Sequence, residues 1–223
     1  MNAPLLEVIE IETAPDPDMA VIWMHGLGAD GGDFVPIVQE LELTDCPPIR
    51  FVFPHAPTMP VTVNNGYVMR AWYDIMGPDL VRREDEAGLR ASEAAIGRLI
   101  AAQVARGIPS ERIILAGFSQ GCAMTLQVGL RYPEKLGGLL CLSGYLPLAG
   151  STAGELSSAN RDLPIFMAHG QSDPVIPIDR AVASRNILAG LGYNIEWHDY
   201  PMPHSVCPEE IDDIGAWFQR VTR

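Results

Sequence analysis

The sequence predicts an α/β fold in which a mostly parallel central sheet carries helices on both faces, as a single compact domain over residues 1–223. Short apolar runs alternate along the chain with longer segments of helical period, which is the pattern of a sheet built from strand and helix units. Several of these runs are almost continuously apolar, as strands buried on both faces should be. With 223 residues and 48% hydrophobic content, the chain can bury a full core.

The elements follow in order from the apolar runs and their boundaries. Strands are expected at residues 6–11, 20–24, 50–53, 113–116, 138–142, 165–168 and 195–200. A long helix is expected over 84–106, because its apolar residues recur mostly at spacings of three, four and seven and a glycine and a proline follow it. Residues 120–132 can form another helix directly after the fourth strand. The last helix begins at Pro208, and its acidic start and basic end both suit the helix dipole.

Composition narrows the classes of partner. The chain has 15 Lys and Arg against 28 Asp and Glu, a formal charge of −13 that repels phosphate backbones and anionic lipid surfaces. We therefore expect a small neutral or cationic partner, no nucleic acid and no stable membrane insertion. The N-terminal residues lack the pattern of a secretory signal and no apolar run could span a bilayer, so a cytoplasmic location is expected. The four cysteines lack metal-ligand spacing and are expected to be reduced, and no metal site is expected.

The stretch "LAGFSQGCAM", residues 115–124, places Ser119 between two glycines at the junction of a strand and a helix. A surface turn would explain so short a motif. The alternative is a nucleophile elbow, in which a bend too tight for larger side chains holds the serine out of the fold. The position between a strand and a helix favours the elbow, so Ser119 is the candidate nucleophile.

A serine nucleophile needs a base within hydrogen-bond reach and an acid that orients the base. His204 lies on the proline-rich loop between the last strand and the last helix, and Asp173 directly follows an earlier strand. The chain order Ser119, Asp173, His204 agrees with that of α/β-hydrolases, although Asp173 could instead serve as a helix cap. Three other histidines are expected to have structural roles. His55 would lie in a turn, His169 at the end of a strand and His198 within a strand.

Acyl transfer also needs backbone N–H groups that point to where negative charge develops. The elbow would supply one from Gln120, and the glycine-rich loop at 25–28, which follows an apolar strand, would supply a second. A phosphate-binding loop is the alternative, but G-x-G-x-x-G is absent and no Lys or Arg lies nearby to meet phosphate. An oxyanion loop is the better interpretation.

The stretches "HGLGADGGDF", "GYVMRAWYDI", "AGFSQGCAM", "GQSDPVIP" and "HDYPMPH" extend over nearly the whole chain. Together and in this order they resemble the carboxylesterase and acyl-protein thioesterase family of α/β-hydrolases, particularly its bacterial carboxylesterase branch. The resemblance implies the α/β-hydrolase fold in one nearly lidless domain and hydrolysis of carboxylic esters or thioesters without a cofactor. It also suggests a homodimer.

The resemblance also implies roles for particular residues. It makes Ser119 the nucleophile, Asp173 the acid and His204 the base, and it gives the oxyanion amides to Leu27 and Gln120. Three residues would border the acyl site unless they merely pack in the core: Trp72, Tyr145 and Leu146. Three residues depart from the family pattern. They are Cys122 after the elbow, Tyr145 where thioesterases tend to carry Trp, and Arg70 in place of a proline.

We therefore expect a serine carboxylesterase that hydrolyses esters of short to medium acyl chains through an acyl-enzyme on Ser119. An acyl-protein thioesterase or lysophospholipase that acts on longer chains is the alternative within the same class. A dienelactone hydrolase fits less well, because it would carry a cysteine in place of the serine. A binding module that kept the pocket and lost turnover is the alternative from another class, and the intact set of serine, histidine and aspartate argues against it.

Overall fold

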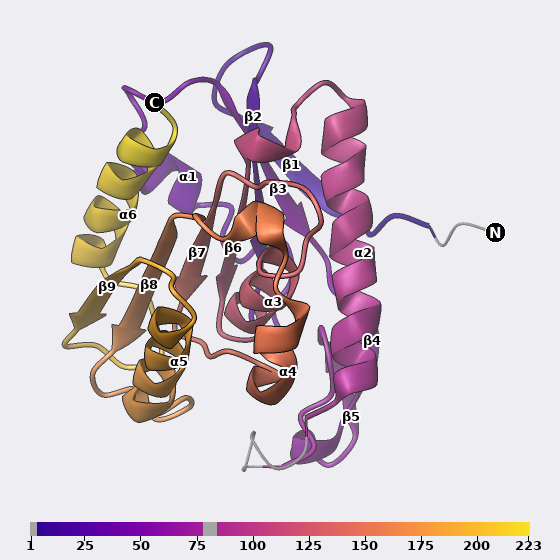
Figure 1. The fold of residues 1–223 in the computed structure, drawn as a ribbon. Helices are drawn as coiled ribbons and strands as arrows, with labels where there is room; N and C mark the ends of the chain where they lie inside the picture. Colours follow the sequence, from indigo (N-terminus) through magenta and orange to yellow (C-terminus); the bar gives the residue numbers. More distant parts are fainter. Residues whose placement is uncertain (1–3, 78–83) are drawn as a thin grey trace.

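A seven-stranded sheet of order β1-β3-β2-β6-β7-β8-β9 forms the centre of the molecule (Figure 1). The computed structural model describes residues 4–77 and 84–223. The strands are β1 (Val8–Glu12), β2 (Met19–Met24), β3 (Ile49–Pro54), β6 (Ile113–Phe118), β7 (Gly138–Leu142), β8 (Ile165–Gly170) and β9 (Ile195–Tyr200). All seven predicted strands are present, with boundaries shifted by no more than two residues. Only the edge strand β1 runs antiparallel to its neighbour, so the prediction of a mostly parallel sheet is confirmed.

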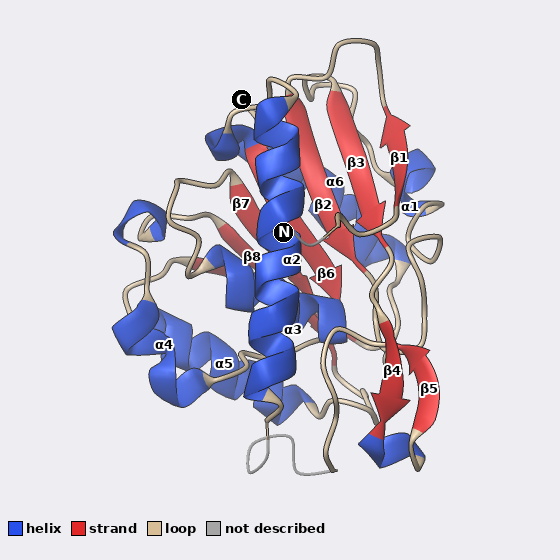
Figure 2. Ribbon diagram, turned by 90° about the vertical axis from the view of Figure 1, so that its right-hand side faces the viewer, coloured by secondary structure: helices blue, strands red, loops and turns tan. Residues whose placement is uncertain are grey.

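Helices cover both faces of the sheet, as predicted. They are α1 (Ile37–Glu40), α2 (Glu86–Ala105), α3 (Gln120–Gly129), α4 (Ala149–Glu155), α5 (Ile178–Gly190) and α6 (Pro208–Val221), with short 3₁₀ turns η1 (Thr62–Asn64), η2 (Ser110–Arg112) and η3 (Ser158–Asn160). Figure 2 shows α2 crossing in front of the sheet, with α1 and α6 behind it. The expected helices at 84–106, 120–132 and the C-terminus correspond to α2, α3 and α6, whereas α1, α4 and α5 were not predicted.

The strand side chains divide between two cores. In β2, Ile22 packs with α2 and α3, while the next residue, Trp23, packs with α1 and α6 on the opposite face. β3 alternates in the same way, since Val52 belongs to the first core and Phe51 to the second. Because both faces are covered, successive residues are buried alike, and this explains the nearly unbroken apolar runs of the sequence.

A small antiparallel hairpin, β4 (Thr58–Val61) and β5 (Tyr67–Arg70), projects from the loop that follows β3 (Figure 2). It was not predicted as strand, and Pro60 is tolerated because a two-stranded ribbon leaves one side of each strand unpaired. Asn65 and Gly66 close it with φ of 56° and 75°, values that these two residue types adopt most readily.

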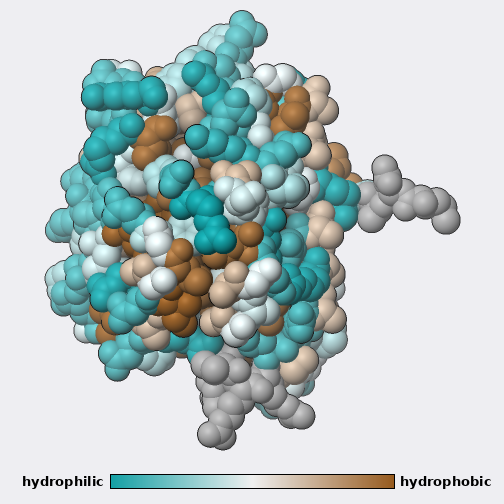
Figure 3. Space-filling model, viewed as in Figure 1, coloured by the Kyte–Doolittle hydropathy of each residue, from teal (hydrophilic) through white to brown (hydrophobic). Residues whose placement is uncertain are grey.

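The face of the molecule seen in Figure 3 is largely hydrophilic. Hydrophilic side chains cover much of the face shown in Figure 3, and the hydrophobic ones form separate patches. Among the helices of the described residues, none combines the length and the apolar character needed to cross a bilayer.

A buried carboxyl group on α6 makes stability depend on pH. Burial raises the pKa of Glu210 from an ordinary 4.5 to about 8; the negative charge of Asp213 adds to this effect and the backbone N–H of Cys207 opposes it. Between these values the folded chain holds a proton that the unfolded chain has released, so the free energy of unfolding should fall as pH rises through this window. Urea unfolding from pH 5 to 8 should show this slope in the wild type and a flatter one in Glu210→Gln. Equal slopes would contradict the prediction.

Candidate active site

Ser119 stands at a sharp bend between β6 and α3. Its backbone has φ 57° and ψ −116°, a strained conformation for a residue with a Cβ. Its N–H donates to the carbonyl of Leu142 at 2.9 Å, which ties the bend to the end of β7. Strain held in place by the surrounding structure is a feature of functional sites, so the bend is more than a surface turn.

The two flanking glycines are required by close backbone packing. A Cβ on Gly117 would lie 2.2 Å from the carbonyl oxygen of Gly121, and a Cβ on Gly121 would lie 2.0 Å from that of Met24. No side chain fits at either place. The motif therefore reflects the approach of α3 to β6 on one side and to the end of β2 on the other.

Replacing Gly121 by alanine should lower the free energy of unfolding by about 1–3 kcal/mol or more, because the backbone at Met24 has to move. Urea denaturation would measure the change. Gly97→Ala is a matched control, since a Cβ there meets nothing within 4 Å in the middle of α2, and it should leave stability equal or raised. An unchanged midpoint for Gly121→Ala would contradict the prediction.

The structure brings Ser119, His204 and Asp173 into one hydrogen-bonded chain. His204 Nε2 lies 2.9 Å from Ser119 Oγ, and His204 Nδ1 lies 2.6 Å from Asp173 Oδ2. An ionised carboxylate only accepts, so the Nδ1 proton donates to Asp173 and leaves Nε2 free to accept from the serine hydroxyl. This is the arrangement in which an imidazole can remove the hydroxyl proton.

Asp173 uses its two carboxylate oxygens differently. Oδ1 accepts from the backbone N–H groups of Val175 and Ile176, both at 2.8 Å, while Oδ2 faces His204. The turn-forming role and the catalytic geometry that the sequence left as alternatives are thus combined in one side chain. Because the turn holds the carboxylate, its free oxygen is directed at the imidazole.

A second histidine lies against the same carboxylate. His169, fully buried at the end of β8, has Nε2 2.8 Å from the carbonyl oxygen of Ile176 and 3.4 Å from Asp173 Oδ2. Burial lowers the pKa of His169, which favours the neutral ring. It packs at the strand end as predicted, but sequence reasoning missed its contact with Asp173.

The loop at 25–28 lies beside Ser119. A Cβ on Gly26 would be 3.4 Å from Ser119 Cβ, and Gly28, with φ 77°, donates its N–H to the carbonyl of Arg70 at 2.9 Å. His25 braces the loop from within, since Nδ1 lies 2.7 Å from Gly26 O and Nε2 accepts from the N–H of Ala56 at 3.1 Å. Burial lowers the pKa of His25, so this ring is neutral and keeps both contacts.

The three family departures have structural explanations. The Arg70 guanidinium donates to the carbonyl of Ala56 at 2.8 Å. It thereby holds the residue whose N–H donates to His25 in the 25–28 loop. Cys122 is a buried thiol and packs against Gly144, where a Cβ would lie 2.5 Å from its sulfur. Tyr145 lines the cavity at Ser119.

This cavity has a volume of about 470 Å³, within the range of ligand sites. Its lining is mostly apolar: Leu27, Val63, Asn64, Tyr73, Ile75, Gly77, Ser119, Gln120, Tyr145, Pro174, Val175, Ile176 and Pro177. Both predicted oxyanion residues, Leu27 and Gln120, belong to it. An acyl chain attached to Ser119 would find apolar walls there.

Two of the predicted substrate contacts lie elsewhere. Trp72 is fully buried and supports the site from behind, because its N–H donates to Gln120 Oε1 at 2.8 Å and its indole N–H to the carbonyl of His25 at 2.9 Å. Leu146 is also buried, with its N–H donating to Ser184 Oγ at 2.9 Å. The neighbour of Trp72, Tyr73, reaches the cavity instead.

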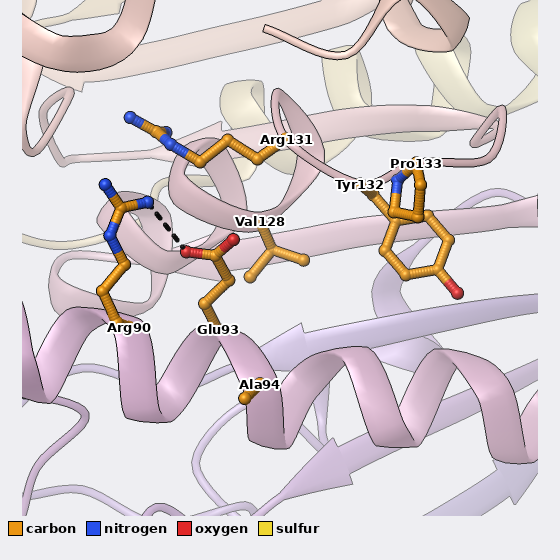
Figure 4. A pocket seen from close by; sticks show the side chains of 7 residues that line it. All are labelled: Arg90, Glu93, Ala94, Val128, Arg131, Tyr132 and Pro133. Atoms are coloured by element: carbon orange, nitrogen blue, oxygen red, sulfur yellow. Dashed lines mark hydrogen bonds and ion pairs between the residues drawn. The ribbon is translucent and has the colours of Figure 1, made fainter. Parts of the chain in front are cut away.

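A second cavity, of about 270 Å³, lies between α2 and the end of α3 (Figure 4). Its charged side chains already have partners. Arg90 lies 2.6 Å and Arg131 lies 2.5 Å from different oxygens of Glu155, and Arg90 also faces Glu93. These pairs join α2, α4 and the turn that follows α3, and none of the lining residues belongs to the group at Ser119.

Comparison with known proteins agrees with the fold. Residues 6–221 match the Phospholipase/Carboxylesterase family. A protein of Gibberella zeae named acyl-protein thioesterase 1 is 41% identical over 99% of this chain and 97% of its own length, and a Neurospora crassa protein of the same name is 41% identical over 87% and 83%. These relatives leave the expected bacterial carboxylesterase branch unsupported.

Solved structures of similar fold also include an acyl-protein thioesterase. Arabidopsis thaliana SOBER1 superposes with a TM-score of 0.87 at 31% identity, covering 92% of this chain and 99% of that one. Zea mays acyl-protein thioesterase 2 superposes with a TM-score of 0.84 at 26% identity, covering 96% and 99%. The chain therefore belongs to the phospholipase/carboxylesterase family of ester hydrolases and has the α/β-hydrolase fold.

Proposed function

We propose that the protein is a serine hydrolase of the acyl-protein thioesterase type, which cleaves thioesters and esters of fatty acyl chains through an acyl-enzyme on Ser119. The observation that carries this proposal is the continuity between the Ser119, His204 and Asp173 chain and a large apolar cavity. The 41% identity to proteins named acyl-protein thioesterase 1 favours long acyl chains over the short to medium ones first expected.

The geometry suggests the order of events. Ser119 Oγ attacks the acyl carbonyl carbon while His204 Nε2 takes the hydroxyl proton, and Asp173 stabilises the imidazolium that forms. The N–H groups of Leu27 and Gln120 would donate to the resulting oxyanion. His204 then protonates the departing thiol or alcohol, and water attacks the acyl-enzyme by the same route in reverse.

The role of the acid can be tested by a change of one atom. Asp173→Asn should keep the turn through Val175 and Ile176 but lower kcat by about 10²–10⁴-fold, because an amide cannot stabilise an imidazolium. Asp199→Asn is the matched control, since Asp199 accepts only from Gln171 at the surface, 3.0 Å away, among the described residues. Steady-state kinetics on both variants decide the matter. If Asp199→Asn lost most of its kcat while Asp173→Asn kept wild-type turnover, Asp173 would not be the catalytic acid.

The substrate class is tested by a series of nitrophenyl esters from acetyl to palmitoyl, measured beside acyl thioesters of the same lengths. We expect kcat/KM to rise with chain length as the chain fills the cavity, and thioesters to be cleaved with comparable or higher kcat/KM. A maximum at short chains and slow thioester cleavage would support a short-chain carboxylesterase instead. Failure of a fluorophosphonate to label Ser119, together with no turnover, would support a binding module.

A further inference from the structure

The mostly apolar cavity beside Ser119 contains a pair of phenol hydroxyls that the proposed chemistry does not use. Tyr73 and Tyr145 both line the cavity, and their hydroxyl oxygens lie 2.8 Å apart. Tyr73 follows the β4–β5 hairpin and Tyr145 follows β7, so two separate segments meet at this hydroxyl pair. Each residue is only 3% exposed.

The hydroxyl pair has hydrogen-bonding capacity left over. Two phenols carry two O–H donors, and their mutual bond uses one of them. Within residues 4–77 and 84–223, neither hydroxyl has another protein partner. Burial raises the pKa of both phenols, so they keep their protons. One O–H and several lone pairs therefore remain for a group inside the cavity.

The charges around the pair decide which group fits. The Arg180 guanidinium stacks on the Tyr145 ring with its central carbon 4.0 Å from the ring centroid, which draws electron density from the phenol and makes its O–H a better donor. Glu84 acts on the same phenol with the opposite sign, and one of its oxygens is held by the N–H of Leu148 at 2.9 Å. Glu84 opposes only part of the attraction of Arg180 for a carboxylate, but the cavity walls are mostly apolar. Burying an ionised carboxylate against such walls costs far more than burying a neutral oxygen, so a neutral oxygen is favoured.

We propose that the Tyr73 and Tyr145 hydroxyls recognise a neutral oxygen on the acyl chain, a hydroxyl or a keto group, so that the enzyme prefers oxygenated acyl chains to plain chains of equal length. The inference rests on the proposed function, because it concerns the acyl group transferred to Ser119. It assigns a specificity role to two residues that lie outside the catalytic chain.

The test uses nitrophenyl octanoates and decanoates that carry a hydroxyl or keto group at successive carbons, with the plain ester and the ester ending in a carboxylate for comparison. The ratio of kcat/KM for oxygenated over plain ester is measured in the wild type and in the Tyr73→Phe, Tyr145→Phe and double variants. Dividing the wild-type ratio by that of the double variant removes the intrinsic reactivity of each ester. Tyr132→Phe, at the second cavity, is the control.

We expect this quotient to reach about three- to tenfold at one position along the chain, since a neutral hydrogen bond contributes about that factor. Each single variant should lose most of the preference, because either one breaks the pair, and Tyr132→Phe should keep it.

A quotient near one at every position, with plain esters still hydrolysed in a Ser119-dependent reaction, would overturn the inference and leave the proposed function standing. A preference for the carboxylate-bearing chain would also overturn it. Absence of turnover on every ester would overturn both the inference and the proposed function. If a phenylalanine variant does not fold, the wild type alone can be used. The competitive inhibition constants of hydroxyacids are then compared with those of plain acids of equal length, and the hydroxyacids should bind more tightly. Equal inhibition constants for the two would overturn the inference.

Discussion

Ser119→Ala should lower kcat by about 10⁴-fold or more on any ester or thioester that the wild type cleaves, because only substrate positioning and the oxyanion amides remain. The fold should persist, since alanine has the same Cβ as serine and the strained backbone at φ 57° is unchanged. Steady-state kinetics and fluorophosphonate labelling measure the loss, with circular dichroism to check folding.

Ser151→Ala is a suitable control for this change. Ser151 lies in α4, outside the group at Ser119, and its hydroxyl donates to the backbone carbonyl of Leu148 at 3.3 Å. It should keep wild-type turnover and labelling. Turnover near the wild-type level in folded Ser119→Ala would remove Ser119 from the mechanism.

His204→Ala should be as damaging as the loss of the serine, about 10⁴-fold or more in kcat, because the hydroxyl then has no base within reach. His198→Ala is the matched comparison. The His198 ring packs on Phe166 at 4.9 Å between centroids and lies 3.1 Å from Glu196, so its loss should affect stability and spare most turnover.

Combining the two catalytic changes gives a sharper test. Residues that act as one unit are not additive, so Ser119→Ala with His204→Ala should be no slower than either variant alone. Kinetics on the four forms, each checked by circular dichroism, provide the measurement. A further loss in the double variant would mean that the two side chains act in separate steps, and a folded but inactive His198→Ala would show that the wrong base was chosen.

The sequence by itself determined the strands, the long helices and the sharp bend that holds Ser119, the candidate nucleophile. A nearly continuous apolar run indicates a strand that is buried on both faces, and this pattern can be recognised without knowing which strands lie beside it. The glycines around Ser119 indicate a bend where close backbone packing leaves no room for a Cβ. The loops of Asp173 and His204 were found in the same way, because parallel strands bring their carboxyl ends to one edge of the sheet. These are properties of local pattern and chain order. The hairpin β4–β5 lacked such a pattern, with a proline and polar residues in its strands and turn, and it was missed.

Only the tertiary structure decided which side chains meet. Trp72 and Tyr73 are adjacent aromatic residues with equal claims in the sequence, yet the Trp72 indole is buried and donates to the carbonyl of His25, whereas Tyr73 reaches the cavity. The contact of His169 with Asp173 depends on the shape of the turn that follows β8, and the meeting of Tyr73 with Tyr145 depends on how two separate loops pack against each other. Periodicity reports whether a side chain is buried, but a partner distant along the chain is set by the three-dimensional path between the two, which no local pattern contains.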